Sequence, residues 1–312
     1  MGQKVNPILY RLAILKNEWK YKFASKNSEE LSLYTFQNIE IKRYLKQFLS
    51  ELGMYLHDYK IFHTMKCLYL YVSYFPSSKI IKNLQKIRRK RAFIGLNTKR
   101  TQISVFLNDK MPIYKKYRKF FEIKKFIYRT ILTKNSFLQQ ILESLTLFLS
   151  KKVNIIIIFQ QVRKGLSLNL NEMTNSHKKI IKNRFLALRK HSKEPSFIDM
   201  LNIIVLCLNL KNSGAILAEF ISKKLQETKR HGQFFYLLKS TLISLQKTKI
   251  SKINGIKIKI KGRLNGRARS TSKLITVGQI PTQTLSHYVD FAEATSYTNN
   301  GTFGIKIWST LK

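Results

Sequence analysis

The sequence predicts an α+β fold in which two domains each combine helices with a sheet. Strict alternation of isoleucine and lysine over Ile256–Lys261 predicts a two-faced strand, because successive strand side chains point to opposite faces. Two helix-type patterns precede this strand, between residues 217 and 245. Another helix-type pattern, followed by two apolar segments, lies between residues 38 and 75. The chain of 312 residues is long enough to give each domain its own core.

The charge of the chain indicates a polyanionic partner. It carries 58 Lys and Arg against 16 Asp and Glu, a formal net charge of +42. A folded protein with this excess repels itself unless a polyanion surrounds it, and nucleic acid is the first candidate because bound cations release counterions from its phosphates. An anionic membrane surface is the second candidate. The hydrophobic share of 44% excludes a disordered polyelectrolyte.

The N-terminal half is expected to hold a helix, two strands, a second helix and a third strand. After an extension over residues 1–37, apolar residues at helical spacing predict a helix from Asn38 to Leu52, and Gly53 ends it. Met54–His63 and Met65–Phe75 have the composition of strands. A capping-box pattern at residues 136–139 opens a helix, and Val153–Val162 alternates so little that it predicts a strand buried on both faces.

Residues 79–135 form an insertion crowded with cations and aromatic residues. Its densest cationic group is Arg88, Arg89, Lys90 and Arg91. Interleaved aromatic side chains suit such a segment to holding phosphates and stacking bases, and we expect the group to contact RNA. The alternative is a solvated basic loop whose aromatic residues pack beneath it.

The C-terminal domain is expected over residues 212–312, after a linker or second insertion at 166–211. The apolar end of that linker, Phe197–Leu210, is expected to pack against a domain or a neighbouring protein. Two amphipathic helices, separated by Gly232, precede the alternating strand. A turn at Gly262–Gly266 follows the strand. The cations expected to bind phosphate here are Lys257 and Lys259 on the polar strand face and Arg263, Arg267 and Arg269 at the turn.

Both ends of the sequence resemble one protein family. The start MGQKVNP with Arg11-Leu12, the stretch GIKIKIKGRLNGRARS, and the segments Val289–Ala294 and Phe303–Trp308 are similar to ribosomal protein S3 of the small subunit. The resemblance implies a KH-like domain over residues 38–165, interrupted by the basic insertion, and a C-terminal domain with two helices on a four-stranded antiparallel sheet.

A KH domain grips the RNA backbone with a GxxG loop, which is degenerate in this sequence. The expected place holds Phe75-Pro76-Ser77-Ser78-Lys79, and the nearest segment with a glycine is Gly95-Leu96-Asn97-Thr98. Neither segment has two glycines, so the KH-like domain is expected to act more as a scaffold than as a clamp.

The resemblance further implies a structural protein in the head of the small ribosomal subunit. Its partners would be small-subunit rRNA, mRNA near the channel through which it enters, and neighbouring head proteins. Gln3, Lys4 and Asn6 would contact rRNA. Cations on the second C-terminal helix of the family line the mRNA channel, and this sequence places Phe235 and Tyr236 near two of those positions. The cations left for that role are Lys239, with Lys229 and Arg230 as substitutes.

The composition also bears on the compartment. Plentiful Lys, Ile, Asn, Phe and Tyr with scarce Gly, Ala and Pro is typical of an AT-rich organellar gene. The MGQKVNP start shows no leader pattern, which favours synthesis inside the organelle. We expect a mitochondrial location, with a plastid as the alternative. The alternative functions are an organellar RNA-processing or splicing factor and a peripheral membrane protein.

The sequence does not assemble a catalytic site. It has no Walker loop, GxGxxG or HExxH motif, and its few acids are too scattered to hold two metal ions. Cys67 and Cys207 have no partners at ligand spacing and are expected to be small buried residues. The longest apolar runs are too short to span a bilayer. We therefore expect no enzymatic activity, no cofactor, no metal site and no membrane span.

Overall fold

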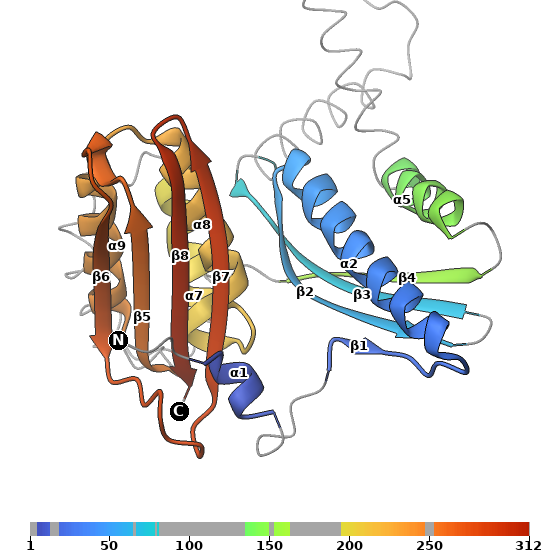
Figure 1. Ribbon diagram of the computed structural model, residues 1–312. Helices are drawn as coiled ribbons and strands as arrows, with labels where there is room; N and C mark the ends of the chain where they lie inside the picture. The colour runs from blue at the N-terminus through green and yellow to red at the C-terminus, as the bar shows by residue number, and fades with distance from the viewer. Residues whose placement is uncertain are drawn as a thin grey trace, which may run out of the picture.

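The computed structural model of the chain describes residues 5–12, 19–64, 67–78, 80, 135–149, 153–162, 195–246 and 253–311. Within these residues the fold is α+β, as predicted, with six α-helices and two four-stranded sheets (Figure 1). The sheets have the strand orders β1-β2-β3-β4 and β6-β5-β8-β7. The predicted RNA-binding residues Lys4, Arg88, Arg89, Lys90 and Arg91 lie outside the described residues.

The N-terminal unit packs two helices on one face of its sheet. Strand β3 pairs with β2 in the antiparallel and with β4 in the parallel direction. Apolar side chains of both helices meet the inward side chains of β2 and β3 in one core. Its elements are β1 (Tyr21–Lys22), α2 (Ser28–Glu51), β2 (Met54–His63), β3 (Cys67–Pro76), α5 (Asn135–Phe148) and β4 (Asn154–Gln161).

Helix α2 begins ten residues before the predicted helix. Its buried residues Ile41, Leu45 and Leu49 lie in the predicted part, whereas Leu31 and Phe36, nearer the N-terminal end, are exposed. The periodicity of the sequence therefore marks only the part of the helix that packs on the sheet. The helix ends as expected, because Gly53 has a φ of +74°, which glycine adopts without strain.

Strand β4 is not buried on both faces as the sequence predicted. Its residues alternate between half-buried and exposed, and Ile156 and Ile158 are exposed. The physical reason is that the described helices cover only one face of the sheet, so alternate side chains of β4 point to the uncovered face. The sequence does not reveal this alternation in burial, because four consecutive isoleucines place the same residue type on both faces of the strand.

The C-terminal unit is a four-stranded antiparallel sheet with three helices on one face, and the predicted antiparallel sheet is confirmed. Figure 1 shows the helices behind the strands. The apolar segment predicted to pack against a domain is α7, which lies in this core. The elements are α7 (Pro195–Asn209), α8 (Gly214–Glu227), α9 (Gly232–Gln246), β5 (Ile253–Gly262), β6 (Thr271–Gly278), β7 (Val289–Thr298) and β8 (Gly301–Leu311).

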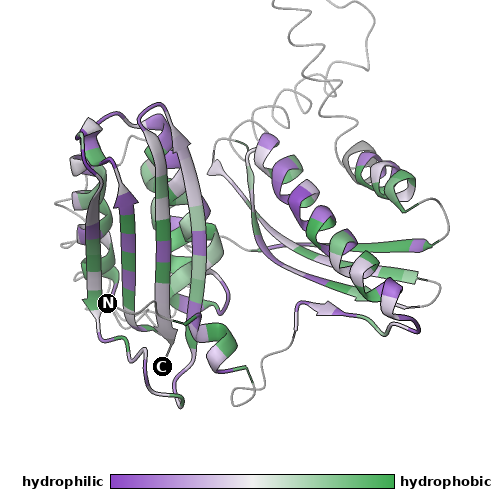
Figure 2. Ribbon diagram, viewed as in Figure 1, coloured by the Kyte–Doolittle hydropathy of each residue, from purple (hydrophilic) through white to green (hydrophobic). Residues whose placement is uncertain are grey.

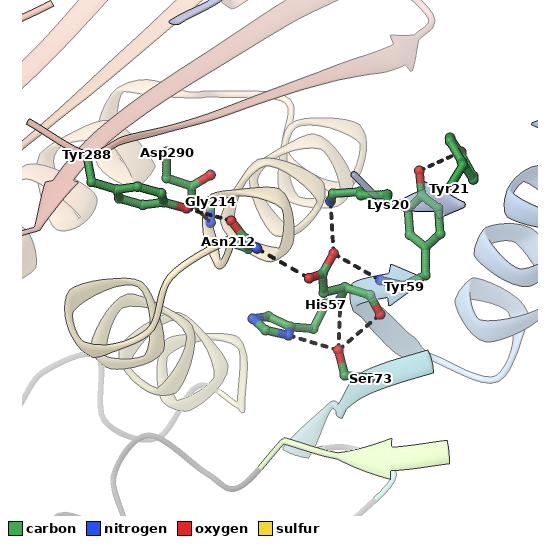
Figure 3. A network of polar contacts seen from close by, with 10 residues as sticks. Lys20, Tyr21, His57, Tyr59, Ser73, Asn212, Gly214, Tyr288 and Asp290 are labelled. Atoms are coloured by element: carbon green, nitrogen blue, oxygen red, sulfur yellow. Dashed lines mark hydrogen bonds and ion pairs between the residues drawn. The ribbon is translucent and has the colours of Figure 1, made fainter. Parts of the chain in front are cut away.

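A polar network joins the two units (Figure 3). The Asp58 carboxylate, on β2, forms an ion pair with Lys20 at 2.9 Å and accepts a hydrogen bond from the Asn212 side chain at 3.3 Å. Asn212 in turn accepts a hydrogen bond from the Tyr288 hydroxyl at 2.6 Å. Because Asn212 and Tyr288 belong to the C-terminal unit, Asp58 ties the two units together.

Two further contacts support this junction. The buried Asp199 carboxylate, on α7, accepts hydrogen bonds from the Ser77 hydroxyl at 2.9 Å and from the Ser78 amide at 2.7 Å. The rings of Tyr55 and Phe220 meet edge-on at 6.3 Å between centroids. Ser77 and Ser78 stand where the GxxG loop was sought. Their burial against α7 favours the scaffold interpretation of this segment.

The N-terminal helix α1 (Pro7–Tyr10) lies at the foot of the C-terminal sheet (Figure 1). Arg11, which follows it, is fully buried. Its guanidinium donates hydrogen bonds to the backbone oxygens of Pro7 at 3.1 Å, Thr282 at 2.8 Å and Thr284 at 2.6 Å. Arg11 thus fastens the start of the chain to the loop between β6 and β7.

Candidate nucleic-acid interface

Five predicted cations gather at one end of the C-terminal unit. Lys229 and Arg230 precede α9, whereas the three arginines lie at the turn between β5 and β6, more than thirty positions later in the chain. All five side chains are exposed. We call this group the turn-end cluster: Lys229, Arg230, Arg263, Arg267 and Arg269.

Two hydrogen bonds between buried His231 and exposed Asn265 hold the two halves of the turn-end cluster together. The His231 amide donates a hydrogen bond to the Asn265 side-chain oxygen at 2.8 Å, and the Asn265 amide donates to His231 Nδ1 at 3.2 Å. Only 2% of His231 is exposed, and its ring lies against Phe303 and Phe235. The reciprocal bonds fix the segment before α9 to the arginine turn.

At the turn, the two residues with positive φ are of types that tolerate this conformation. Asn265, with a φ of 57°, and Gly266, with a φ of +74°, both occupy the left-handed region that Asn and Gly tolerate best. The Arg263 Nε donates a hydrogen bond to the Arg267 backbone oxygen at 3.0 Å. This bond uses one edge of the Arg263 guanidinium and leaves the terminal nitrogens facing solvent, where they can bind phosphate.

The second cationic surface is the face of the C-terminal sheet that no helix covers in the described part of the chain. The alternation on β5 is visible as coloured bands in Figure 2. Its isoleucines are buried against the helices, and its lysines point outward. We call this surface the open face. We define it by the residues of β5, β8 and the adjoining edge strand β7: Lys257, Lys259 and Lys261 on β5, Lys306 and Trp308 on β8, and Phe291 and Glu293 on β7.

The register of the strands arranges the open face in rows. Lys257 lies opposite Trp308, which lies opposite Phe291, and Lys259 lies opposite Lys306, which lies opposite Glu293. The Lys257 ammonium sits 5.6 Å from the centroid of the Trp308 ring. Sequence reasoning missed Trp308 and Lys306 as candidate binding residues. The alternating run from Phe303 to Trp308 places them on one face, but only the pairing register sets them beside the lysines of β5.

The described acids of the C-terminal unit are either buried or paired with a lysine. Asp290 and Glu219 are buried, and burial raises the pKa of each carboxyl above its ordinary value. Asp290 accepts a hydrogen bond from the Gly214 amide at 2.9 Å. Glu227 and Glu293 are exposed, but each forms an ion pair with a lysine. The exposed surface of this unit is therefore strongly positive.

The residues of α9 near the proposed mRNA channel positions differ in exposure. Lys239 is exposed on α9, apart from the open face, and Tyr236 beside it is 71% exposed. Phe235 is buried in the core. Exposed Gln233, Tyr236 and Lys239, each one helical turn from the next, can meet a ligand on this side of α9.

The described residues give no sign of metal or membrane chemistry. They contain no group of three or more His, Cys, Asp or Glu side chains placed to hold a metal ion. No described helix has the length and apolar character needed to cross a bilayer. Burial raises the pKa of the Cys207 thiol to about 12, which makes it inert, whereas Cys67 is only half-buried.

Comparison with known proteins agrees with the resemblance of the C-terminal end. Residues 237–309 match the family described as "Ribosomal protein S3, C-terminal domain". The small ribosomal subunit protein uS3c of Tupiella akineta is 31% identical over 115 residues, which cover 36% of this chain and 48% of that protein. The uS3 protein of Synechocystis sp. is 32% identical over 100 residues, covering 32% of this chain and 39% of that protein.

A third relative is the uS3 protein of Borrelia duttonii, 40% identical over 94 residues that cover 30% of this chain and 32% of that protein. The matched part of the chain thus spans about half, or less, of the length of these relatives.

Proposed function

Because the chain belongs to the ribosomal protein S3 family through its C-terminal domain, we propose that it is a structural, rRNA-binding component of the small ribosomal subunit head. The observation that carries the proposal is the turn-end cluster, in which five exposed cations from two segments are fixed by the His231–Asn265 pair. Exposed guanidinium and ammonium groups without competing acids are suited to the phosphates of folded RNA. Neighbouring head proteins would complete its contacts.

The N-terminal unit is proposed to be a KH-like domain. Its helix, two strands, helix and strand follow one another in the order that the resemblance implies. The burial of Ser77 and Ser78 against α7 supports a scaffolding role for this unit rather than a backbone clamp.

A part in the mRNA channel is proposed for the outer side of α9. Exposed Tyr236 and Lys239 support it, together with the cations that precede the helix. The burial of Phe235 leaves this surface with fewer cations than the family pattern implies, so we expect it to contact message weakly.

The ribosome that holds this chain is proposed to be organellar. Its composition favours a mitochondrion, whereas the uS3c names of its algal relatives favour a plastid. Fractionating the cell and following the chain by mass spectrometry decides between them. Co-sedimentation with small-subunit rRNA in high salt would support the ribosomal function, and recovery with intron RNA would favour the splicing-factor alternative.

The test of the proposed interface is the salt dependence of rRNA binding. Replacing Arg263, Arg267 and Arg269 together by Ala removes up to three phosphate contacts. The slope of log affinity against log salt should fall by about 0.7–0.9 per lost contact, or about 2–3 in total. Binding is measured with the full chain and a small-subunit rRNA fragment over a series of KCl concentrations.

The matched control removes three exposed cations from the N-terminal unit. Lys26, Arg43 and Lys46 are exposed on or just before α2, and their replacement by Ala lowers the net charge by the same amount. We expect the control to keep most of the salt slope. Equal losses of slope in both variants would show that total charge, rather than the turn-end cluster, determines binding.

A further inference from the structure

The open face combines cations with an aromatic pair, which the turn-end cluster lacks. The rings of Trp308 and Phe291 lie 5.4 Å apart between centroids and are inclined by 42°. Both are half-buried, so one part of each ring packs on the sheet and another part meets solvent. Lys257 stands over the Trp308 ring, and Lys259 and Lys261 continue along β5.

We propose that the open face binds unpaired RNA nucleotides, whose bases stack on Trp308 and Phe291 while the lysines of β5 hold the phosphates. The proposal rests on the proposed ribosomal function and names the kind of RNA that this second surface takes. A flat sheet that presents aromatic rings beside cations is suited to single strands, because every unpaired base offers a face for stacking.

The geometry of β5 supports a strand of nucleotides lying along the sheet. Alternate residues of a β-strand are about 6.6–6.8 Å apart, so Lys257, Lys259 and Lys261 form a straight line of cations about 13 Å long. This line starts beside Trp308, because Lys257 and Trp308 are direct cross-strand neighbours. A base on Trp308 would therefore have its own phosphate within reach of Lys257 and the next phosphates within reach of the following lysines.

Charge favours RNA over a second copy of this chain as the occupant. The residues that define the open face include four lysines and one acid, and that acid, Glu293, is paired with Lys306 at 2.9 Å. A second copy of this chain, with its own net charge of +42, would be repelled. A polyanion with aromatic faces of its own matches both the lysines and the rings.

The test uses Trp308 as its own reporter. The chain has two tryptophans, and Trp19 is 62% exposed, so Trp19→Phe leaves Trp308 as the sole tryptophan at little structural cost. Titrating this full-length variant with an unstructured oligouridine should quench the fluorescence saturably. A duplex RNA of the same length, which presents no free base faces, should quench far less at equal binding.

Affinity measurements with substitutions complete the test. Trp308→Leu should weaken oligouridine binding about 5- to 150-fold, the range of one lost stacking contact, and Trp308→Phe should restore most of it. Phe36→Leu, which removes an exposed aromatic ring from α2, is the control and should leave the affinity unchanged. The restoration by Phe separates stacking from a general loss of folding.

Three other outcomes would overturn the proposal, and they show whether the proposed ribosomal function fails with it. If Trp308 stays unquenched while the chain binds rRNA through the turn-end cluster, the open face does not bind RNA and the proposed function stands. The same holds if Trp308 responds only to a ribosomal protein, because the open face is then a protein contact. If neither surface affects RNA binding, the proposed function fails as well.

Discussion

The His231–Asn265 pair allows the geometry of the turn-end cluster to be separated from its charge. His231→Phe keeps a ring against Phe303 and Phe235 but removes Nδ1, the acceptor of the Asn265 amide. Loss of a hydrogen bond in such a part-buried setting costs about 0.5–1.5 kcal/mol, and the removal of Nε2, which is buried without a hydrogen-bond partner among the described residues, offsets part of this cost. For a chain of this size each kcal/mol corresponds to about 2–4 °C in Tm, so thermal unfolding should detect the loss.

Asn265 provides an independent comparison at the same contact. Asn265→Gly removes the side-chain oxygen that accepts from the His231 amide, but glycine tolerates the observed φ of 57°. Asn265→Ala loses the same bond and adds about 1–2 kcal/mol of backbone strain, because a Cβ disfavours the left-handed region. The expected order of stability is therefore wild type, then the glycine variant, then the alanine variant.

We also expect the His231 and Asn265 variants to bind rRNA less tightly. The variants at His231 and Asn265 remove no cation, so the salt slope should stay at the wild-type value while the affinity itself falls. Wild-type stability and affinity for His231→Phe would refute the idea that the pair positions the turn. A fall in slope like that of the triple arginine variant would also refute it, because all the phosphate contacts should remain.

Two further predictions concern the acids at the junction of the two units. Asp58→Ala should lower stability by about 1–2 kcal/mol, measured by thermal unfolding, whereas Glu40→Ala, at an exposed ion pair, should change it by less than about 0.5 kcal/mol. For Asp290, burial raises the folded pKa, so stability is lost as pH rises from the ordinary value through the raised pKa. Asp290→Asn keeps an oxygen for the Gly214 amide, and its gain over wild type should therefore grow as pH rises above the ordinary Asp pKa of about 4 and be absent below it.

The sequence predicted those parts of the fold that depend on local periodicity. The Ile-Lys alternation identified the two faces of β5, and helical spacing identified most of the apolar buried face of α8 and α9. It missed Phe235, which is buried although the sequence placed it near the channel positions. Helix α2 and strand β4 show the limit of this reasoning. The exposed end of α2 has no apolar stripe to recognise, and an isoleucine run has the same appearance whether one face or both are buried.

The candidate site was predictable only residue by residue. The arginines near Gly262 and the cations before α9 each stood out, but their assembly depends on a contact between His231 and Asn265 across 34 positions. Asn265 was recognisable as a turn residue, and nothing local indicated its partner. Arg11 illustrates the same limit, because a cation in a basic N-terminal segment gives no sign that backbone carbonyls will surround it.

The placement of the acids connects the composition of the chain to the proposed function. Asp58, Asp199 and Asp290 each accept hydrogen bonds where the two units meet or within the C-terminal core, so the fold uses carboxylates where a fixed anionic acceptor is needed. The open face carries one acid, Glu293, which is paired with Lys306, and the turn-end cluster contains none. Mutational bias towards lysine would add cations everywhere but would not keep acids away from particular surfaces. Glu29, Glu51 and Glu143 are exposed on helices of the N-terminal unit, whereas the two cationic surfaces carry a single acid. This scarcity of acids is what a surface held against a polyanion requires, because each exposed carboxylate there would repel a phosphate.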